Sequence, residues 1–346
     1  MNGLSVLEKV AIRKHLSDDA LFKRIDNAIY EMTVELEALS EETTDPRMHE
    51  DLPRILLNGG KRLRPVLAYL SYQMAVFDGS LTDDGAQKAT NARIIPLMCM
   101  LELMHTVSLI HDDVVDSADK RRGVETINKT SGDDAAIRSG DFLLAKAMEK
   151  LKFYRGTGIN EELAEVSAEM CRGELNQLTL RYNLDEQNEY SYYLCIRRKT
   201  AALLAGSCYC GALAAGMDKE KAEAIKAFGE RFGLAFQIRD DVMDFSSSAD
   251  SGKNVGQDIK NGILTLPILL AKEEMNDEML SVLTKIDKTQ GEIDSIIRFV
   301  RDTDALKNAE IKVKLLCEEA ISFLDSFSKS SYKDALVTMV KTFVEI

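Results

Sequence analysis

Two clusters of aspartate share the same internal spacing. Each places three carboxylates after an apolar run: Asp112, Asp113 and Asp116 in LIHDDVVD, and Asp240, Asp241 and Asp244 in FQIRDDVMD. Residues four apart share one face of a helix, so the first and third aspartates of each cluster project together. Like charges at the negative end of a helix repel one another, and a bound cation would offset that cost.

The chemistry of these clusters favours Mg²⁺. Mg²⁺ takes hard oxygen ligands, keeps several waters and shares phosphate oxygens with its substrate. An EF-hand is excluded because neither cluster has the loop glycine and the twelfth-position glutamate. A single cluster would be typical of a solvated acidic helix end, but two copies favour a common metal-binding role.

Basic residues near the aspartates indicate the ligand. NGGKRLRP, residues 58–65, places Lys61 and Arg64 on the first turn of a predicted helix, where backbone N–H groups favour an anion. The other basic candidates are Arg121, Arg122, Lys199, Lys253 and Lys260. Metal and arginine together bind diphosphate, whereas the absence of a P-loop or GxGxxG motif argues against a nucleotide.

The elements that position these residues are predicted to be helices. Only five prolines occur among 346 residues, and no stretch alternates with period two long enough to predict a strand. Polar or glycine-rich breaks are expected at 41–51, 78–85 and 246–262, the last as a loop. Helical periodicity covers 1–40 (broken at 18–19), a segment from 61, then 88–116, 134–154, 160–184, 187–216, 218–245 and 263–275. We expect one large all-α domain over residues 1–346.

Composition narrows the class and the compartment. A net charge of −13 argues against nucleic acid as a main partner. The six cysteines show no CxxC spacing, which favours reduced thiols, and the charged N-terminus lacks the apolar core of a signal peptide. Residues 200–217 are uncharged but rich in Gly, Ala and Ser, which favours a buried core helix over a membrane span. We therefore expect a soluble cytoplasmic protein.

Six motifs in this order resemble the trans-prenyltransferases that make isoprenyl diphosphates. They are GGKRLRP, LIHDDVVDSADKRRG, SGDFLLAKA, Lys199-Thr200, FQIRDDVMDF and GKNVGQDIKNGILTLP. The resemblance covers roughly residues 50–270. It implies an all-α bundle of helices around a central cavity, a homodimer, and three Mg²⁺ ions per active site. The implied reaction joins an allylic diphosphate to isopentenyl diphosphate and repeats.

The resemblance also implies a role for each matching residue. The six aspartates would bind the Mg²⁺ ions that bridge the allylic diphosphate. Contacts to that diphosphate would come from Arg121, Lys199 and Lys253. The isopentenyl diphosphate pocket would comprise Lys61, Arg64, His105 and Arg122. The reacting centre would be lined by Thr200 and Gln237. His105 has a second interpretation, as a hydrogen-bonded core histidine.

Product length should depend on the helix that ends in the first cluster. Residues one and two turns before Asp112 would lie progressively deeper in the cavity: Ser108 and Val107, then Met104, then Leu101. No aromatic residue occurs in 88–111, so we expect a product longer than farnesyl diphosphate, in the medium-to-long range. Phe142 on the neighbouring helix is the alternative floor and would shorten the product.

Four other functions are open at this stage. A terpene cyclase shares the carbocation chemistry but would not need GGKRLRP, because it binds no second diphosphate. A subunit of a heteromeric synthase usually loses one aspartate motif or the arginines, and this chain keeps both. A short-chain synthase and an acidic metal-buffering protein are the remaining two. An amphipathic product would also imply transient membrane contact.

Overall fold

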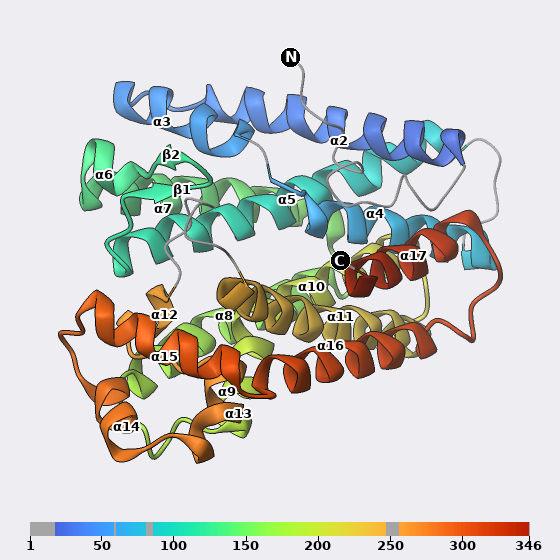
Figure 1. Ribbon diagram of the computed structural model, residues 1–346. Coiled ribbons are helices and arrows are strands. Elements are labelled where there is room, and N and C mark those ends of the chain that lie inside the picture. Colours follow the sequence, from blue (N-terminus) through green and yellow to red (C-terminus); the bar gives the residue numbers. More distant parts are fainter. Residues whose placement is uncertain (1–17, 59, 81–85, 247–255, 346) are drawn as a thin grey trace. The chain divides into compact units, whose positions relative to one another are not determined.

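The computed structural model describes residues 18–58, 60–80, 86–246 and 256–345 (Figure 1). Within these ranges the regular structure is helical except for a two-stranded hairpin, β1 (Lys120–Arg121) and β2 (Val124–Glu125). The described residues divide into two compact units. The first unit lies within Met1–Leu163, Gly206–Lys226 and Ser326–Ile346, and the second within Ala164–Ala205 and Ala227–Asp325. The all-α prediction is confirmed, and one domain over residues 1–346 stays a prediction.

The first unit is built around one apolar helix. Its elements are α2 (Asp19–Ser40), α3 (Pro46–Leu57), α4 (Leu63–Ala75), a π-helical turn (Val76–Ser80), α5 (Ala86–Val115), α6 (Ile127–Ser131), α7 (Asp133–Lys150), a 3₁₀ turn (Leu151–Tyr154) and α17 (Ser331–Glu345). Helix α5 packs most extensively on α7 and α4, and α2 covers it as well (Figure 1). Ala92–Val115 is long and apolar enough to cross a membrane, but 72% of its most apolar window is buried in the protein. A core helix has this environment.

The second unit carries the other aspartate cluster. Its elements are the greater part of α8 (Ile159–Leu180), α9 (Glu189–Ile196), a π-helical segment (Arg197–Ala201), the start of α10 (Ala202–Ala214), most of α11 (Lys219–Ser246), α12 (Gln257–Lys260), α13 (Leu266–Ala271), a 3₁₀ turn (Lys272–Glu274), α14 (Asp277–Thr284), α15 (Gln290–Asp302) and α16 (Ala305–Ser322). Side chains start two of these helices, because Asn188 with Ser191 and Thr289 with Glu292 form capping boxes.

Several predicted boundaries were wrong for local reasons. The expected linker 41–51 contains the start of α3, because Asp45 caps that helix and Pro46 occupies its first position. The expected helix 187–216 is interrupted by the π-helical segment Arg197–Ala201. The expected loop 246–262 contains α12, and its residues 247–255 lie outside the described residues. The helix predicted over 160–184 ends at Leu180.

The hairpin was missed because two-residue strands are too short to show a period. Its loop consists of Arg122 and Gly123, with φ of 51° and 83°. Positive φ at both loop residues is what a two-residue hairpin loop requires. The hairpin turns the chain back after α5 and so places Arg121 beside Asp113 of the first aspartate cluster.

Candidate active site

The first aspartate cluster lies where α5 ends. The amide N–H of Asp116 donates to the carbonyl of Asp112 over 2.8 Å, so the helical path continues through all three aspartates. The N–H of Ala118 then reaches back to the carbonyl of Asp113 (2.9 Å), and Ser117 adopts φ of 49°. This bonding pattern with a left-handed residue closes a helix C-terminus. The predicted position of the cluster at a helix end is therefore confirmed.

Asp113 is the buried member of this cluster. Its Oδ1 accepts a hydrogen bond from Arg121 Nε (2.7 Å) and forms an ion pair with Arg121 Nη2 (2.7 Å). Burial raises the pKa of Asp113, and the neighbouring Arg121 guanidinium opposes that shift. Hairpin strand β1 therefore supplies the counter-charge for the first cluster. The sequence showed only that Arg121 follows this cluster closely along the chain.

Arg122 packs against Gly60 of GGKRLRP. Gly60 has φ of +100°, and a Cβ there would lie 2.7 Å from Arg122 Nη1. Arg64 lies close to Arg122. Burial lowers the pKa of Arg64 to about 10, and the positive charge of Arg122 contributes to this shift. The Nε atom of Arg64 is buried and has no hydrogen-bond partner. Arg64 and Arg122, both predicted to bind isopentenyl diphosphate, thus come together in the first unit.

His105 lies among these arginines. Burial lowers its pKa well below the ordinary value, and four guanidinium groups lower it further, those of Arg64, Arg122, Arg121 and Arg62. The imidazole is therefore neutral at physiological pH and can donate one hydrogen bond and accept another. Lys61, three residues before Arg64, is exposed.

Sequence reasoning missed the buried ion pair between Arg62 and Glu102 at this cluster. Only 8% of Arg62 and 3% of Glu102 is exposed. The available signal was a lone glutamate within the apolar part of the helix, one turn before His105.

In the second unit, Asp241 is the centre of a hydrogen-bond chain. The hydroxyl of Tyr192 donates to Asp241 Oδ2 (2.6 Å), and Gln237 Nε2 donates to Asp241 Oδ1 (2.8 Å). The hydroxyl of Thr200 in turn donates to Gln237 Oε1 (2.8 Å). Burial raises the pKa of Asp241 well above its usual range, the charge of Asp258 adds to this, and the two hydrogen bonds oppose it. The predicted residues Thr200, Gln237 and Asp241 are therefore joined, and Tyr192 was missed.

A small cavity adjoins Asp241. Its volume is about 10 Å³, close to the size that admits one water. Three aspartates are among the residues that line it, which are Asp241, Asp244, Phe245, Gly256, Gln257, Asp258, Ile259, Thr265 and Ile297. Asp258 had no role in the sequence analysis, although it lies in the quoted segment GKNVGQDIKNG. Asp240, by contrast, is exposed.

Of the two lysines predicted to contact the allylic diphosphate, the structure describes only Lys199. Lys199 Nζ donates to Gln177 Oε1 over 2.8 Å and pairs with Glu174, both on α8. The backbone of α8 approaches closely here, because a Cβ on Gly173 would lie 2.8 Å from the backbone N of Lys199. Lys253 lies outside the described residues.

The residues predicted to set product length lie on α5 and α7. Met104 and Val107 are buried, whereas Ser108 is half-buried and donates to the carbonyl of His105 over 2.8 Å. Phe142 is half-buried on α7, with Lys146 Nζ 5.7 Å from its ring centroid. Their effect on chain length stays a prediction.

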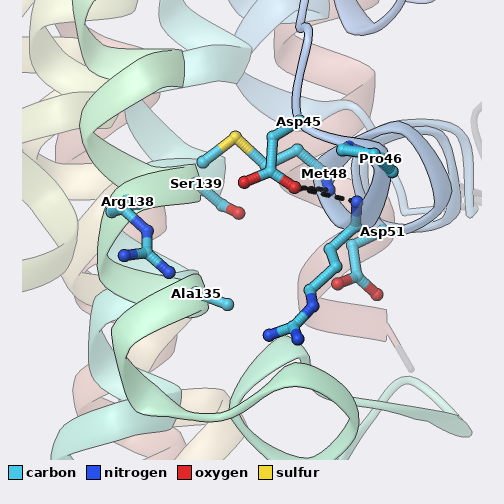
Figure 2. A pocket seen from close by; sticks show the side chains of 8 residues that line it. Asp45, Pro46, Met48, Asp51, Ala135, Arg138 and Ser139 are labelled. Atoms are coloured by element: carbon cyan, nitrogen blue, oxygen red, sulfur yellow. Dashed lines mark hydrogen bonds between the residues drawn. The ribbon is translucent and has the colours of Figure 1, made fainter.

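A separate cavity of about 470 Å³ lies between α3 and α7 (Figure 2). In Figure 2, Asp45, Met48 and Asp51 come from the α3 side, and Arg138 and Ser139 face them from α7. Protein groups already neutralise two of its charges, since Arg54 pairs with Asp51 (2.6 Å) and Asp134 with Arg138 (3.1 Å). None of the predicted site residues lines this cavity.

The sequence of residues 45–300 matches the family described as polyprenyl synthetase. The chain belongs to this family. It is 32% identical to heptaprenyl diphosphate synthase component 2 of Bacillus subtilis over 86% of this chain and 82% of that protein. It is 31% identical to the octaprenyl diphosphate synthase of Haemophilus influenzae over 82% of this chain and 84% of that protein.

A solved structure agrees with this assignment. The heptaprenyl diphosphate synthase of Staphylococcus aureus has 31% sequence identity and a TM-score of 0.84, covering 93% of this chain and 98% of that one. The polyprenyl synthetase fold therefore extends over nearly the whole chain. Membership makes the protein a prenyltransferase of isoprenoid biosynthesis, a polyprenyl diphosphate synthase.

The carboxylates of this synthase fit a metal site that waters and substrate phosphates complete better than a site formed by protein ligands alone. In the part of the chain that the structure describes, no three His, Cys, Asp or Glu side chains converge enough to hold a metal ion alone. Mg²⁺ needs only one or two carboxylates when waters and substrate phosphates complete its shell. The water-sized cavity beside Asp241, Asp244 and Asp258 fits that requirement.

Proposed function

We propose that this synthase condenses isopentenyl diphosphate with an allylic diphosphate and repeats, yielding a medium- to long-chain all-trans polyprenyl diphosphate. The observation that carries the proposal is the arrangement along α5. His105, within its group of arginines, precedes the carboxylate of Asp112 by seven residues. Seven residues are two turns, about 10.5 Å along one helix face. One helix therefore presents an anion site and a metal-binding site, as two diphosphate substrates require.

In the proposed mechanism, the metal-binding site and the anion site bind different substrates. Mg²⁺, three ions per active site, would be held by the six aspartates and would neutralise the charge that develops on the departing allylic diphosphate. Arg121 and Lys199, with Lys253, provide further positive charge for that leaving group. Arg64, Arg122 and Lys61 bind the diphosphate of isopentenyl diphosphate, and neutral His105 donates a hydrogen bond to it.

The bond-forming step needs no protein nucleophile. The allylic C–O bond breaks and leaves an allylic cation, and the double bond of isopentenyl diphosphate attacks it. The new cation then loses a proton to the departing diphosphate. Thr200 and Gln237, linked by their hydrogen bond, line the reacting centre.

The chain-length proposal rests on two supports. The similar proteins above are named as a component of a heptaprenyl diphosphate synthase and as an octaprenyl diphosphate synthase. In addition, α5 carries small or flexible side chains at Met104, Val107 and Ser108. A short-chain product is the alternative if Phe142 closes the cavity. A heteromeric enzyme is the other alternative, and the name of the Bacillus subtilis protein, component 2, favours it.

We further propose a cytoplasmic homodimer that contacts the membrane transiently when it releases product. Helix α7 exposes Ile137, Leu144 and Met148, spaced seven and four residues apart on one face. Such a stripe suits burial against a second copy. The six cysteines are free thiols, in keeping with a reducing compartment.

A product assay tests the proposed function. The purified chain is incubated with Mg²⁺, labelled isopentenyl diphosphate and either geranyl or farnesyl diphosphate, and the dephosphorylated products are resolved by length. We expect a ladder that extends beyond the farnesyl length and disappears with EDTA. A ladder that stops at farnesyl or geranylgeranyl would establish the short-chain alternative. No incorporation by a folded protein would favour the heteromeric alternative.

A further inference from the structure

One buried ion pair connects three helices beside the basic cluster. The guanidinium of Arg62 donates to the carboxylate of Glu102 on α5 and to the backbone carbonyl of Leu56 at the end of α3. Arg62 itself immediately precedes α4. Because more than nine-tenths of both side chains is buried, neither is available to bind substrate directly.

The backbone at Arg62 is held in an unfavourable conformation. Its φ of 47° and ψ of 37° are left-handed, and no side chain caps α4 at this point. A non-glycine residue keeps such a conformation only where its surroundings impose it. The two bonds of the Arg62 side chain provide that restraint. The bend lies between Lys61, which is exposed, and Arg64, which is half-buried beside Arg122.

Glu102 is also the buried anion within a group of cations. It lies one turn before His105 on α5, and its charge favours the protonated forms of Arg64 and Arg122, opposing their burial and their mutual repulsion. Glu102 accepts its hydrogen bond from Arg62. Arg64 and Arg122 are therefore stabilised by its field, and Arg64 Nε has no hydrogen-bond partner within the protein.

We propose that Glu102 is a positioning residue for the diphosphate of isopentenyl diphosphate, and that it acts through Arg62 on the conformation that presents Lys61 and Arg64. The proposal rests on the function proposed above, because it assumes that the basic cluster holds this substrate. Glu102 touches no substrate atom and acts before the chemical step, so its contribution belongs to substrate binding more than to turnover.

Glu102→Gln tests this role, because it keeps the size and a hydrogen-bonding oxygen but removes the charge. We expect the KM for isopentenyl diphosphate to rise roughly tenfold, with kcat and the KM for the allylic diphosphate changed less than about twofold. Glu102→Asp, which restores the charge, should recover part of the loss. Arg62→Met should resemble Glu102→Gln, and the double variant should be no worse than either single variant.

Glu35→Gln is the matched control, because Glu35 forms another cross-helix ion pair in the same unit, with Lys150. It should lower thermal stability without changing either KM. Equal shifts in both KM values, or the same pattern in Glu35→Gln, would overturn the positioning role.

A binding measurement separates this inference from the proposed function. Calorimetric titration with isopentenyl diphosphate alone needs no turnover, and Glu102→Gln should bind roughly tenfold more weakly than the unaltered chain. Binding that weakens in this way without any product formation would support the positioning role and count against the catalytic proposal. Product formation with unchanged binding would do the reverse, and no binding by the unaltered chain would overturn the inference.

Discussion

At the scale of the residue, Asp241 of the second aspartate cluster depends on the two side chains that donate hydrogen bonds to it. Asp241 is 5% exposed, yet the metal-binding role proposed for it requires an ionised carboxylate. Hydrogen bonds from Tyr192 and Gln237 favour its charged form against burial and the charge of Asp258. Such outer partners orient a metal-binding carboxylate and adjust its basicity.

Tyr192→Phe removes one of these donors and keeps the ring. The carboxylate of Asp241 then holds its proton more tightly, and we expect the Mg²⁺ concentration for half-maximal activity to rise roughly tenfold. The measurement is a Mg²⁺ titration of the condensation rate. Tyr193→Phe is the control, since the Tyr193 ring lies 5.7 Å from that of Tyr192. Equal Mg²⁺ requirements in the two variants would contradict the assignment.

His105 predicts a pH dependence of stability. Its folded pKa lies well below the ordinary value of 6.5, so the folded protein binds no proton there while the unfolded chain binds one as the pH falls below 6.5. Unfolding is therefore favoured by acid, by up to about 2 kcal/mol between pH 7.5 and pH 5. Urea unfolding of the substrate-free protein at both pH values measures the change. His105→Gln should lose less stability over this interval, and an equal loss would show that His105 is not the source.

At the scale of the element, α5 combines two roles, as the core of the first unit and as the predicted wall of the product cavity. Val107 is 7% exposed and lies five residues before Asp112. The sequence fits a long product because the side chains on this stretch are not aromatic.

Val107→Phe should shorten the product by introducing a ring into that wall. The product ladder, resolved by length, measures the effect. Val34→Phe on α2 is the control, because Val34 is 46% exposed on another helix. Unchanged chain length in Val107→Phe would show that this part of α5 does not set the length and would turn attention to Phe142.

Close approach of α10 to α4 gives a stability prediction. A Cβ on Gly211 would lie 2.3 Å from the backbone oxygen of Ala68, which cannot move without shifting α4. Gly211→Ala should therefore destabilise the protein by about 1–3 kcal/mol. Gly291→Ala on α15 meets nothing within 4 Å and should stabilise it by up to about 1 kcal/mol. Chemical denaturation compares the two, and similar effects would refute the packing argument.

At the scale of the whole molecule, the synthase leaves an apolar stripe on α7. Ile137, Leu144 and Met148 are 44%, 37% and 38% exposed, respectively. These side chains would lose contact with water in the proposed homodimer, which would offset the cost of exposing them in the monomer.

Leu144→Lys should dissociate that dimer, because the interface would have to bury an unpaired charge. Sedimentation velocity at micromolar concentration gives the oligomeric state, and we expect monomers from the variant and dimers from the parent. Ile311→Lys on α16 is the control, since Ile311 is also exposed but lies outside the α7 stripe. Dimers from Leu144→Lys would place the interface elsewhere.

The sequence alone predicted the class of protein, which the family match confirms, and it supplied the residues proposed to do the chemistry. Its helical composition, the repeated aspartate spacing and the ordered motifs predicted an all-α prenyltransferase, because each signal is local. Helix boundaries failed where a few residues decided them, as at Asp45 with Pro46 and in the hairpin loop Arg122-Gly123.

Only the tertiary structure showed the partners that hold the site in place. Arg62 and Glu102 are separated by 40 residues, and Tyr192 and Asp241 by 49. No periodicity relates such residues, since their contact exists only once the helices pack. Burial makes these contacts matter, because a charge removed from water must find its partner within the fold. The sequence therefore determined which groups could do the chemistry, and packing decided which other groups keep them charged, oriented and available.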